Sequence, residues 1–101
     1  MPPTPSGVTG TVYIFWDDDH DLEETVDKYR ACVQSANTVG GCTVRSRVVE
    51  VGDTTAPGFK YWSTKATIEV VGVRDGEVVD RLRNPSVKCA AIHTMVSEMC
   101  S

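Results

Sequence analysis

The most constraining feature of the sequence is a turn signal between two runs of β-forming residues. Arg74-Asp75-Gly76 separates residues 63–73 from residues 77–83. Asp-Gly between such runs favours a two-residue hairpin turn, because both residues tolerate the positive φ that the turn requires. We therefore expect an antiparallel hairpin here. Alternation along its first strand predicts inward positions at Ala66, Ile68 and Val70, and opposite positions at Lys65, Thr67 and Glu69.

The N-terminal half predicts a strand followed by a helix. Residues 10–16 are β-branched and aromatic, which is typical of a strand. Asp21 with Glu24 three residues later resembles a capping box, and glycines at positions 40 and 41 favour a helix end. We expect a helix from Asp21 to about Asn37. Its apolar positions form one stripe at Leu22, Val26, Tyr29, Val33 and Ala36.

The remaining elements follow from similar signals. Residues 43–51 alternate imperfectly and predict a strand, and residues 52–58 form a turn-rich loop. Asn84-Pro85 predicts a helix start, with asparagine as N-cap and proline at the first helical position. One face of this last helix carries Cys89, Ile92, Val96 and Met99.

Together these elements predict one α+β domain with the order β-α-β-β-β-α. A chain of 101 residues can bury one modest core, which suits a single domain over residues 10–101 after a flexible arm at residues 1–9. We expect a mainly antiparallel sheet with two helices packed on one face. The long loop after residue 51 leaves the order of the strands open.

A resemblance to a known family adds to this reading. The segment from Asp21 to Met99 resembles the α-β-β-β-α layout of the double-stranded-RNA-binding domain. Residues 72–76 (Gly-Val-Arg-Asp-Gly) and 87–91 (Val-Lys-Cys-Ala-Ala) are similar to that family's third strand and its Ala-rich second helix. With the extra first strand, the order also resembles ribosome-hibernation factors. The resemblance implies an RNA- or ribosome-associated role, although Lys88 alone stands where the family has its lysine cluster.

The acidic charge is concentrated near the N-terminus. The net charge is −4, and seven of the fourteen acids precede residue 28. Asp17, Asp19 and Asp21 are weak candidates for a divalent metal, since carboxylates between a strand and a helix can bind Mg²⁺ or Ca²⁺. Their spacing is not that of a calcium loop, and we favour helix capping instead. His20 and His93 have no serine or cysteine motif beside them, so we expect no enzymatic activity and no cofactor.

The four cysteines are Cys32, Cys42, Cys89 and Cys100. No pair has the C-x-x-C spacing of a zinc site. Cys32 and Cys89 fall on the apolar stripes of the two helices, where a reduced cysteine behaves as a small apolar side chain. We expect reduced thiols, with a disulfide at Cys42 or Cys100 conceivable in an oxidising compartment.

Basic and aromatic residues mark the strongest candidate for a binding surface. If the strands pair as a meander, several of these residues share the sheet face opposite the helices, where they could bind phosphates, stack on bases or contact a protein. The alternative, which we favour, is a solvated face with Glu50, Glu69, Glu77 and Asp80 in cross-strand ion pairs. The candidate partner-binding residues are Arg45, Arg47, Tyr61, Trp62, Lys65, Arg81 and Arg83, with Lys60 beside them.

These observations predict a non-catalytic binding module that acts through a protein partner or self-association. Trp62, Arg45 and Arg47 are the expected anchors. An RNA- or ribosome-associated module is the second hypothesis, and a metal-dependent enzyme using residues 17–21 is the third. The sequence has no apolar run long enough for a membrane span, and its first residues lack the pattern of a signal peptide. We therefore expect a cytoplasmic location.

Overall fold

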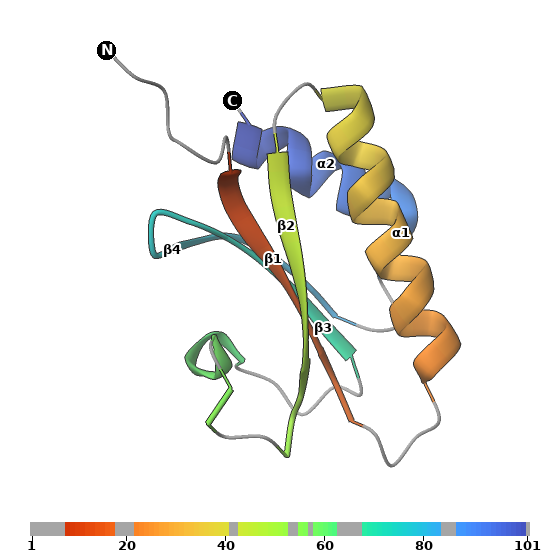
Figure 1. Cartoon of the computed structure of the whole chain (residues 1–101), viewed down its shortest axis with the longest axis vertical. Helices are drawn as coiled ribbons and strands as arrows, with labels where there is room; N and C mark the ends of the chain where they lie inside the picture. Colours follow the sequence, from red (N-terminus) through yellow and green to blue (C-terminus); the bar gives the residue numbers. More distant parts are fainter. Residues whose placement is uncertain are drawn as a thin grey trace.

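A computed structural model describes residues 8–17, 22–40, 43–52, 55–56, 58–62, 68–83 and 87–100. It confirms the α+β class and the β-α-β-β-β-α order (Figure 1). The elements are β1 (Val8–Trp16), α1 (Glu23–Gly40), β2 (Thr43–Glu50), a 3-10 helix η2 (Phe59–Tyr61), β3 (Ile68–Arg74), β4 (Glu77–Arg83) and α2 (Cys89–Cys100).

The four strands form one sheet in the order β2-β1-β3-β4. β1 pairs in parallel with β2, because α1 carries the chain back to the start of the sheet between them. β3 pairs antiparallel with β1, and β4 pairs antiparallel with β3. The sheet is therefore mixed but mostly antiparallel. It is not a meander, since β3 lies beside β1 and not beside β2.

The hairpin predicted at Asp75-Gly76 is confirmed. Asp75 has φ 54° and Gly76 has φ 80°, so both central residues of the turn are left-handed. This is the requirement of a type I′ turn, whose twist matches that of the strands it joins. The β3–β4 ladder runs from Arg74 opposite Glu77 to Glu69 opposite Arg83, with an irregularity between Gly72 and Val73.

Both helices pack on one face of the sheet, as expected. Figure 1 shows α1 and α2 on one side of the strands and η2 on the other. Val12, Ile14 and Trp16 of β1 point into the helix-covered core. Other members of this core are Val26, Tyr29, Cys32, Val33, Ala36, Val44, Ile68, Val70, Val87, Ile92, Met95, Val96 and Met99. The inward positions predicted at Ile68 and Val70 are thus confirmed, while Ala66 lies outside the described residues.

Several element boundaries differ from the predicted ones. α1 ends at Gly40 and not at about Asn37, and β2 ends at Glu50, one residue early. β1 begins at Val8, two residues before the expected start, and residues 1–7 of the expected arm lie outside the described residues. α2 begins at Cys89 and not at Pro85, because Val87 and Lys88 are not helical. Val87 is buried in the core, and its carbonyl oxygen accepts a hydrogen bond of 3.3 Å from the Tyr29 hydroxyl. Because Val87 is anchored in this way, Val87 and Lys88 form a non-helical segment that leads into α2. Asn84, Pro85 and Asp21 lie outside the described residues.

A second, smaller cluster lies on the sheet face opposite the helices, which we call the second face. Phe15, Val49, Val71 and Val73 are buried there. Half-buried residues from β1 and the segment after β2 cover them, namely Tyr13, Val51, Ala56, Phe59, Tyr61 and Trp62. The described residues of the segment between β2 and β3, for which the sequence predicted only a turn-rich loop, therefore cover part of the second face. We call residues 58–62 of this segment the covering segment.

Candidate binding face

The register of the sheet places the basic residues on the second face. Arg45 lies beside Thr11 and Arg47 lies beside Tyr13 in the parallel β1–β2 pair. Neighbouring residues in register point to the same side of a sheet, and Tyr13 belongs to the second-face cluster. On the other edge, Arg81 lies opposite Val71 and Arg83 opposite Glu69. All four arginines therefore share the face that the sequence suggested for them.

Arg81 and Arg83 are engaged by one buried carboxylate. The Glu69 side chain is 0% exposed, and its Oε2 lies 3.1 Å from Arg83 Nε and 3.4 Å from Arg81 Nη1. Burial of a carboxylate is tolerated here because two guanidinium groups neutralise it. Glu69 is thus on the side that alternation predicted, but the prediction that it is solvated is wrong. Tyr13, Phe59, Tyr61 and Trp62 pack over part of this face, where a solvated face with exposed aromatic residues was expected.

The other acids of the expected ion-pair lattice do not join it. Glu50 lies beside Trp16 in register, at the end of β2 and toward the helix side. The Asp80 carboxylate accepts a 2.8 Å hydrogen bond from the backbone N–H of Arg81. Within the described residues, Glu50, Glu77 and Asp80 form no ion pair with the arginines of the second face. The solvated cross-strand lattice is therefore reduced to Glu69 and its two arginines.

Arg81 also ties the covering segment to the sheet. Its Nη1 donates a hydrogen bond to the carbonyl oxygen of Tyr61, at the end of η2. The same nitrogen contacts Glu69. A continuous polar connection therefore runs from Glu69 through Arg81 to Tyr61, which gives Arg81 a structural role.

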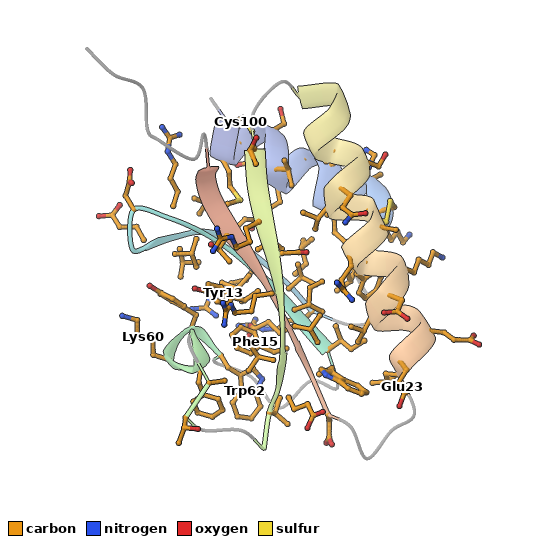
Figure 2. All side chains as sticks on the ribbon, in the orientation of Figure 1. Tyr13, Phe15, Glu23, Lys60, Trp62 and Cys100 are labelled. Atoms are coloured by element: carbon orange, nitrogen blue, oxygen red, sulfur yellow. A yellow bond between two sulfur atoms is a disulfide. The ribbon has the colours of Figure 1, made fainter. Side chains whose placement is uncertain are left out.

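The aromatic residues pack against each other and the sheet. Ring centroids lie 5.4 Å apart for Tyr13 and Tyr61, and 5.8 Å apart for Phe59 and Trp62. Figure 2 shows Tyr13, Phe15 and Trp62 gathered near η2, with Lys60 at its outer side. Tyr61 and Trp62 are half-buried. Lys60 is exposed, with its Nζ 5.2 Å from the centroid of the Tyr61 ring.

Arg45 and Arg47 differ from the other two arginines. Both are exposed on β2, which is an edge strand because it pairs with β1 alone. In the part of the chain that the structure describes, neither side chain has a hydrogen-bond or ion-pair partner. The second face thus offers two free positive charges, two residues apart, along an edge of the sheet.

The remaining site predictions fall partly outside the described residues. Lys65, Asp19 and Asp21 are among these, so their positions are not described. Asp17 is described and follows β1 directly. Across the described ranges, no group of three or more histidine, cysteine or acidic side chains is placed to bind a metal ion. None of the described helices is both long enough and apolar enough to cross a membrane.

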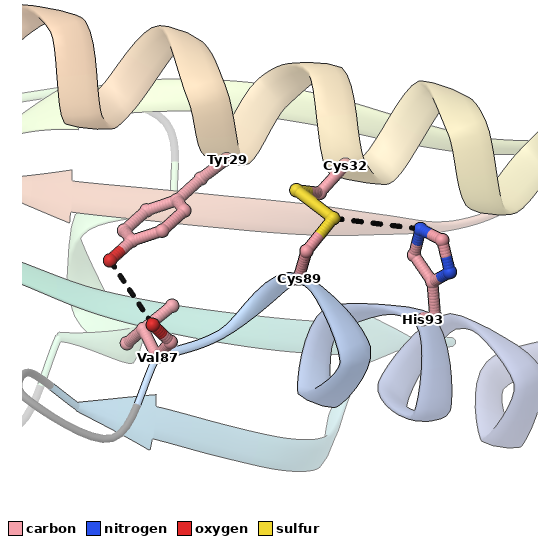
Figure 3. Close-up of a disulfide and its surroundings, with 5 residues drawn as sticks. All are labelled: Tyr29, Cys32, Val87, Cys89 and His93. Atoms are coloured by element: carbon pink, nitrogen blue, oxygen red, sulfur yellow. Dashed lines mark hydrogen bonds between the residues drawn. A yellow bond between two sulfur atoms is a disulfide. The ribbon is translucent and has the colours of Figure 1, made fainter.

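The expectation of reduced thiols is wrong. Cys32 on α1 and Cys89 on α2 form a disulfide, with their Cα atoms 5.5 Å apart (Figure 3). Cys100 is also disulfide-bonded, and Cys42 lies outside the described residues. The apolar stripes of both helices face the same layer, which brings their cysteines together although 57 positions separate them in sequence. The matching positions of Cys32 and Cys89 on two helices of one face were the available signal.

Comparison with known proteins adds information about the fold. No protein-family model matches the chain, and no curated protein sequence matches it. A solved structure with a similar fold is thioredoxin-2, described as a component of malaria parasite protein secretion machinery. The TM-score is 0.61 at 10% sequence identity, and the alignment covers 97% of this chain and 98% of that chain. At this identity the similarity extends to the fold alone, which is thioredoxin-like.

Proposed function

We propose that this protein is a non-catalytic binding module that receives an acidic, extended segment of a partner protein along β2. The observation that carries the proposal is the free state of Arg45 and Arg47 among the described residues. Arg81 and Arg83 are engaged by Glu69, whereas the two arginines of β2 are exposed and form no ion pair with any acid that the structure describes.

The position of β2 explains why an extended segment is the expected ligand. An edge strand can accept a further strand through its outer backbone groups, which is a common mode of peptide recognition. Side chains two residues apart on the added strand point to the same face as Arg45 and Arg47. Acidic residues at alternate positions of the ligand therefore meet both arginines at once.

Local charge supports an acidic ligand despite the negative charge of the whole chain. The described basic residues on or beside the second face are Arg45, Arg47, Lys60, Arg81 and Arg83, and Glu69 is the acid among them. Attraction at such a surface acts over about 8–10 Å at ordinary ionic strength. We therefore expect affinity for the acidic segment to fall as salt is raised.

RNA is the second hypothesis, because the same arginines could bind phosphates. Proteins that bind single strands combine such charges with aromatic rings on which bases stack. Tyr61 and Trp62 are half-buried and packed on Tyr13 and Phe59, which leaves little ring surface for a base. This packing favours a protein ligand over RNA.

A charge-reversal experiment tests the proposal. The probe is a fluorescent eight-residue peptide of alternating glutamate and valine, measured by anisotropy. Arg45→Glu with Arg47→Glu should weaken its binding roughly tenfold or more, since two attractive pairs become repulsive. The matched control is Lys28→Glu with Arg30→Glu on α1, which makes the same charge change on exposed helix positions and should leave binding nearly unchanged.

Each other outcome contradicts the proposal. Equal weakening by the two double variants would mean that the peptide responds to net charge and not to β2. Binding of a short single-stranded RNA, lost in Arg45→Glu with Arg47→Glu while the peptide does not bind, would replace the protein ligand by RNA. Self-association through β2 would appear as a dimer in size-exclusion chromatography with light scattering that the same variant dissociates.

We further propose that the protein works in an oxidising compartment. Disulfides persist in such compartments and are rare in the reducing cytosol, so the Cys32–Cys89 bond outweighs the cytoplasmic location suggested by the N-terminal residues. Alkylation of the protein from its own host, without reduction, should then modify none of its four cysteines. Modification of all four cysteines in that experiment would restore the cytoplasmic location.

A further inference from the structure

The two sulfur atoms of the Cys32–Cys89 disulfide have unlike surroundings. Cys32 is 5% exposed within α1 and belongs to the buried core. Cys89 is half-buried and is the first residue of α2. Cys89 is therefore the more exposed residue of the pair and the expected point of attack for an incoming reagent.

A histidine lies next to the sulfur of Cys89, the more exposed residue of the pair. His93 is one helical turn after Cys89, and its Nε2 lies 3.7 Å from Cys89 Sγ (Figure 3). A histidine at this distance can donate a proton or a hydrogen bond to a cysteine thiolate, depending on which ring nitrogen carries the proton. The free backbone N–H groups at the start of α2 favour negative charge at the same atom. Cys89 is thus the sulfur at which a thiolate is best stabilised.

The two helices do not depend on the disulfide alone to stay together. The Tyr29 hydroxyl on α1 donates to the carbonyl oxygen of Val87, just before α2. Val33 of α1 and Ile92 and Val96 of α2 are buried in the same apolar core. Opening the disulfide therefore leaves both the polar link and the apolar contact in place.

We propose that the Cys32–Cys89 pair is a redox-active disulfide that exchanges with dithiols, with Cys89 forming the mixed disulfide. A thiolate of the dithiol attacks Cys89 Sγ, so that a new S–S bond forms and the Cys32–Cys89 bond breaks. Cys32 leaves with the bonding electron pair and takes up a proton. The dithiol is the reductant, and the protein disulfide is the oxidant.

The second half of the exchange uses the stabilised sulfur as leaving group. The remaining thiol of the dithiol, once deprotonated, attacks its own partner sulfur in the mixed disulfide. Cys89 departs as a thiolate beside His93, and the dithiol becomes a cyclic disulfide. Two electrons and two protons pass in total to the cysteine pair. The buried Cys32 is then the thiol that closes the bond again on reoxidation.

The first test follows the opening of the disulfides in the unaltered protein. Dithiothreitol is added at 25 °C, samples are alkylated at intervals, and each cysteine is assigned by peptide mass spectrometry. Cys32 and Cys89 should be modified at least tenfold faster than Cys100, with the far-ultraviolet circular dichroism spectrum retained. Opening of both bonds at one rate together with loss of the spectrum would mean a structural bond that opens by unfolding, and would overturn the proposal.

The second test compares the two sulfur atoms directly. Cys32→Ser leaves the thiol of Cys89, and Cys89→Ser leaves the thiol of Cys32, so each variant is the matched control of the other. The Cys89 thiol should react with an aromatic disulfide reagent roughly tenfold faster than the Cys32 thiol, because its thiolate is more accessible and better stabilised. Equal rates would contradict the role given to Cys89.

The role of His93 needs a measurement that would not change if His93 only packed against its neighbours. Adding His93→Gln to Cys32→Ser should slow the reaction of Cys89 several-fold while the melting temperature stays within a few degrees. An unchanged rate would remove His93 from the proposal. If Cys32→Ser and Cys89→Ser do not fold, the alkylation time course in the unaltered protein decides whether the disulfide is redox-active. His93→Gln is then made in the unaltered protein.

Discussion

Two glycines with the same backbone conformation have very different surroundings. Gly58 has φ 86° and Gly76 has φ 80°, a region that residues with a side chain rarely adopt. A Cβ at Gly76 would meet no atom within 4 Å, whereas a Cβ at Gly58 would fall inside contact distance of three ring atoms of Tyr13. Gly58 thus allows the segment before η2 to pass close over the second face.

We predict that Gly58→Ala is much more destabilising than Gly76→Ala. Both changes pay for the left-handed backbone, at about 1 kcal/mol each. Gly58→Ala adds overpacking against Tyr13, for a total of about 3 kcal/mol. Urea unfolding of the two variants measures the difference. Equal free energies of unfolding would show that the segment can move away from Tyr13 without loss.

Tyr29 gives a prediction about pH. Burial raises the pKa of its phenol above the ordinary value of 10.0. The unfolded chain therefore loses this proton at a lower pH than the folded protein, and the free energy of unfolding falls as pH rises above 10. Tyr29→Phe should lower stability by about 1 kcal/mol near neutral pH, through loss of the hydrogen bond to Val87, and should flatten the decline.

Urea midpoints between pH 8 and pH 11 check this prediction. The unaltered protein and Tyr29→Phe should differ most near neutral pH and converge toward the alkaline end. Parallel curves across the whole range would mean that Tyr29 ionises as easily in the folded protein as in the unfolded chain.

At the scale of elements, the carboxylate of Glu69 links β3 and β4 to the covering segment, residues 58–62, through Arg81. Glu69 on β3 engages Arg81 on β4, and Arg81 donates to the carbonyl of Tyr61. If Glu69 loses its charge, Arg81 loses the anion that fixes its position. The contact with Tyr61 should then weaken, although Tyr61 itself is unchanged.

We therefore predict that Glu69→Gln loosens residues 58–62 as well as lowering stability. The expected loss is ~2 kcal/mol, since the arginines are partly exposed and recover some hydration. Amide hydrogen exchange should rise in residues 58–62 more than in the β1–β2 pair. Glu77→Gln, an exposed acid on β4, is the control and should leave exchange unchanged. Uniform acceleration in Glu69→Gln would point to a loss of overall stability alone.

Local signals were sufficient for some elements and not for others. The Asp75-Gly76 turn requires two left-handed residues, so the sequence predicts the hairpin whatever surrounds it. The start of α2 is different, because the asparagine–proline signal competes with the burial of Val87 and its bond to Tyr29, which is 58 residues away in sequence. Contacts of such range are invisible to a local pattern. The burial of Glu69 was missed for the same reason.

For the whole molecule, the disulfide between α1 and α2 contributes a large share of the free energy of unfolding, which is small in a domain of this size. Closing a loop of 57 residues removes unfolded-chain entropy worth about 4 kcal/mol. Domains of this size have roughly 5–15 kcal/mol in total. The apolar core between the helices and the sheet, the second-face cluster and the disulfide of Cys100 supply the remainder.

We predict that Cys32→Ala with Cys89→Ala stays folded at 25 °C but melts at a much lower temperature. A loss of about 4 kcal/mol corresponds to roughly 20 °C in a chain of this length. A thermal melt under non-reducing conditions measures it. A shift of only a few degrees would mean that the unfolded chain is already compact around these cysteines. Loss of folding at 25 °C would contradict the persistence of the reduced fold assumed for disulfide exchange.

The strand order could not be read from the sequence, although the fold class could. Alternation and turn signals fix where strands lie along the chain, but the neighbours of β1 depend on how α1 and the segment after β2 pass across the sheet. The sequence analysis did name the residues of the candidate face, and Arg45, Arg47, Arg81 and Arg83 do share one side of the sheet. The sequence did not predict that two of these arginines contact Glu69 and two do not, because this difference depends on the burial of Glu69.

The central place of β1 in the sheet has a consequence for biosynthesis. A growing chain emerges from its N-terminus, so β1, α1 and β2 are made before β3, which begins at Ile68. Until then, one edge of β1 has no neighbour and Cys32 has no Cys89 to join. Such an unpaired edge is prone to wrong association. Completion of the sheet and oxidation of this cysteine pair are therefore late events that follow release of the C-terminal half from the ribosome.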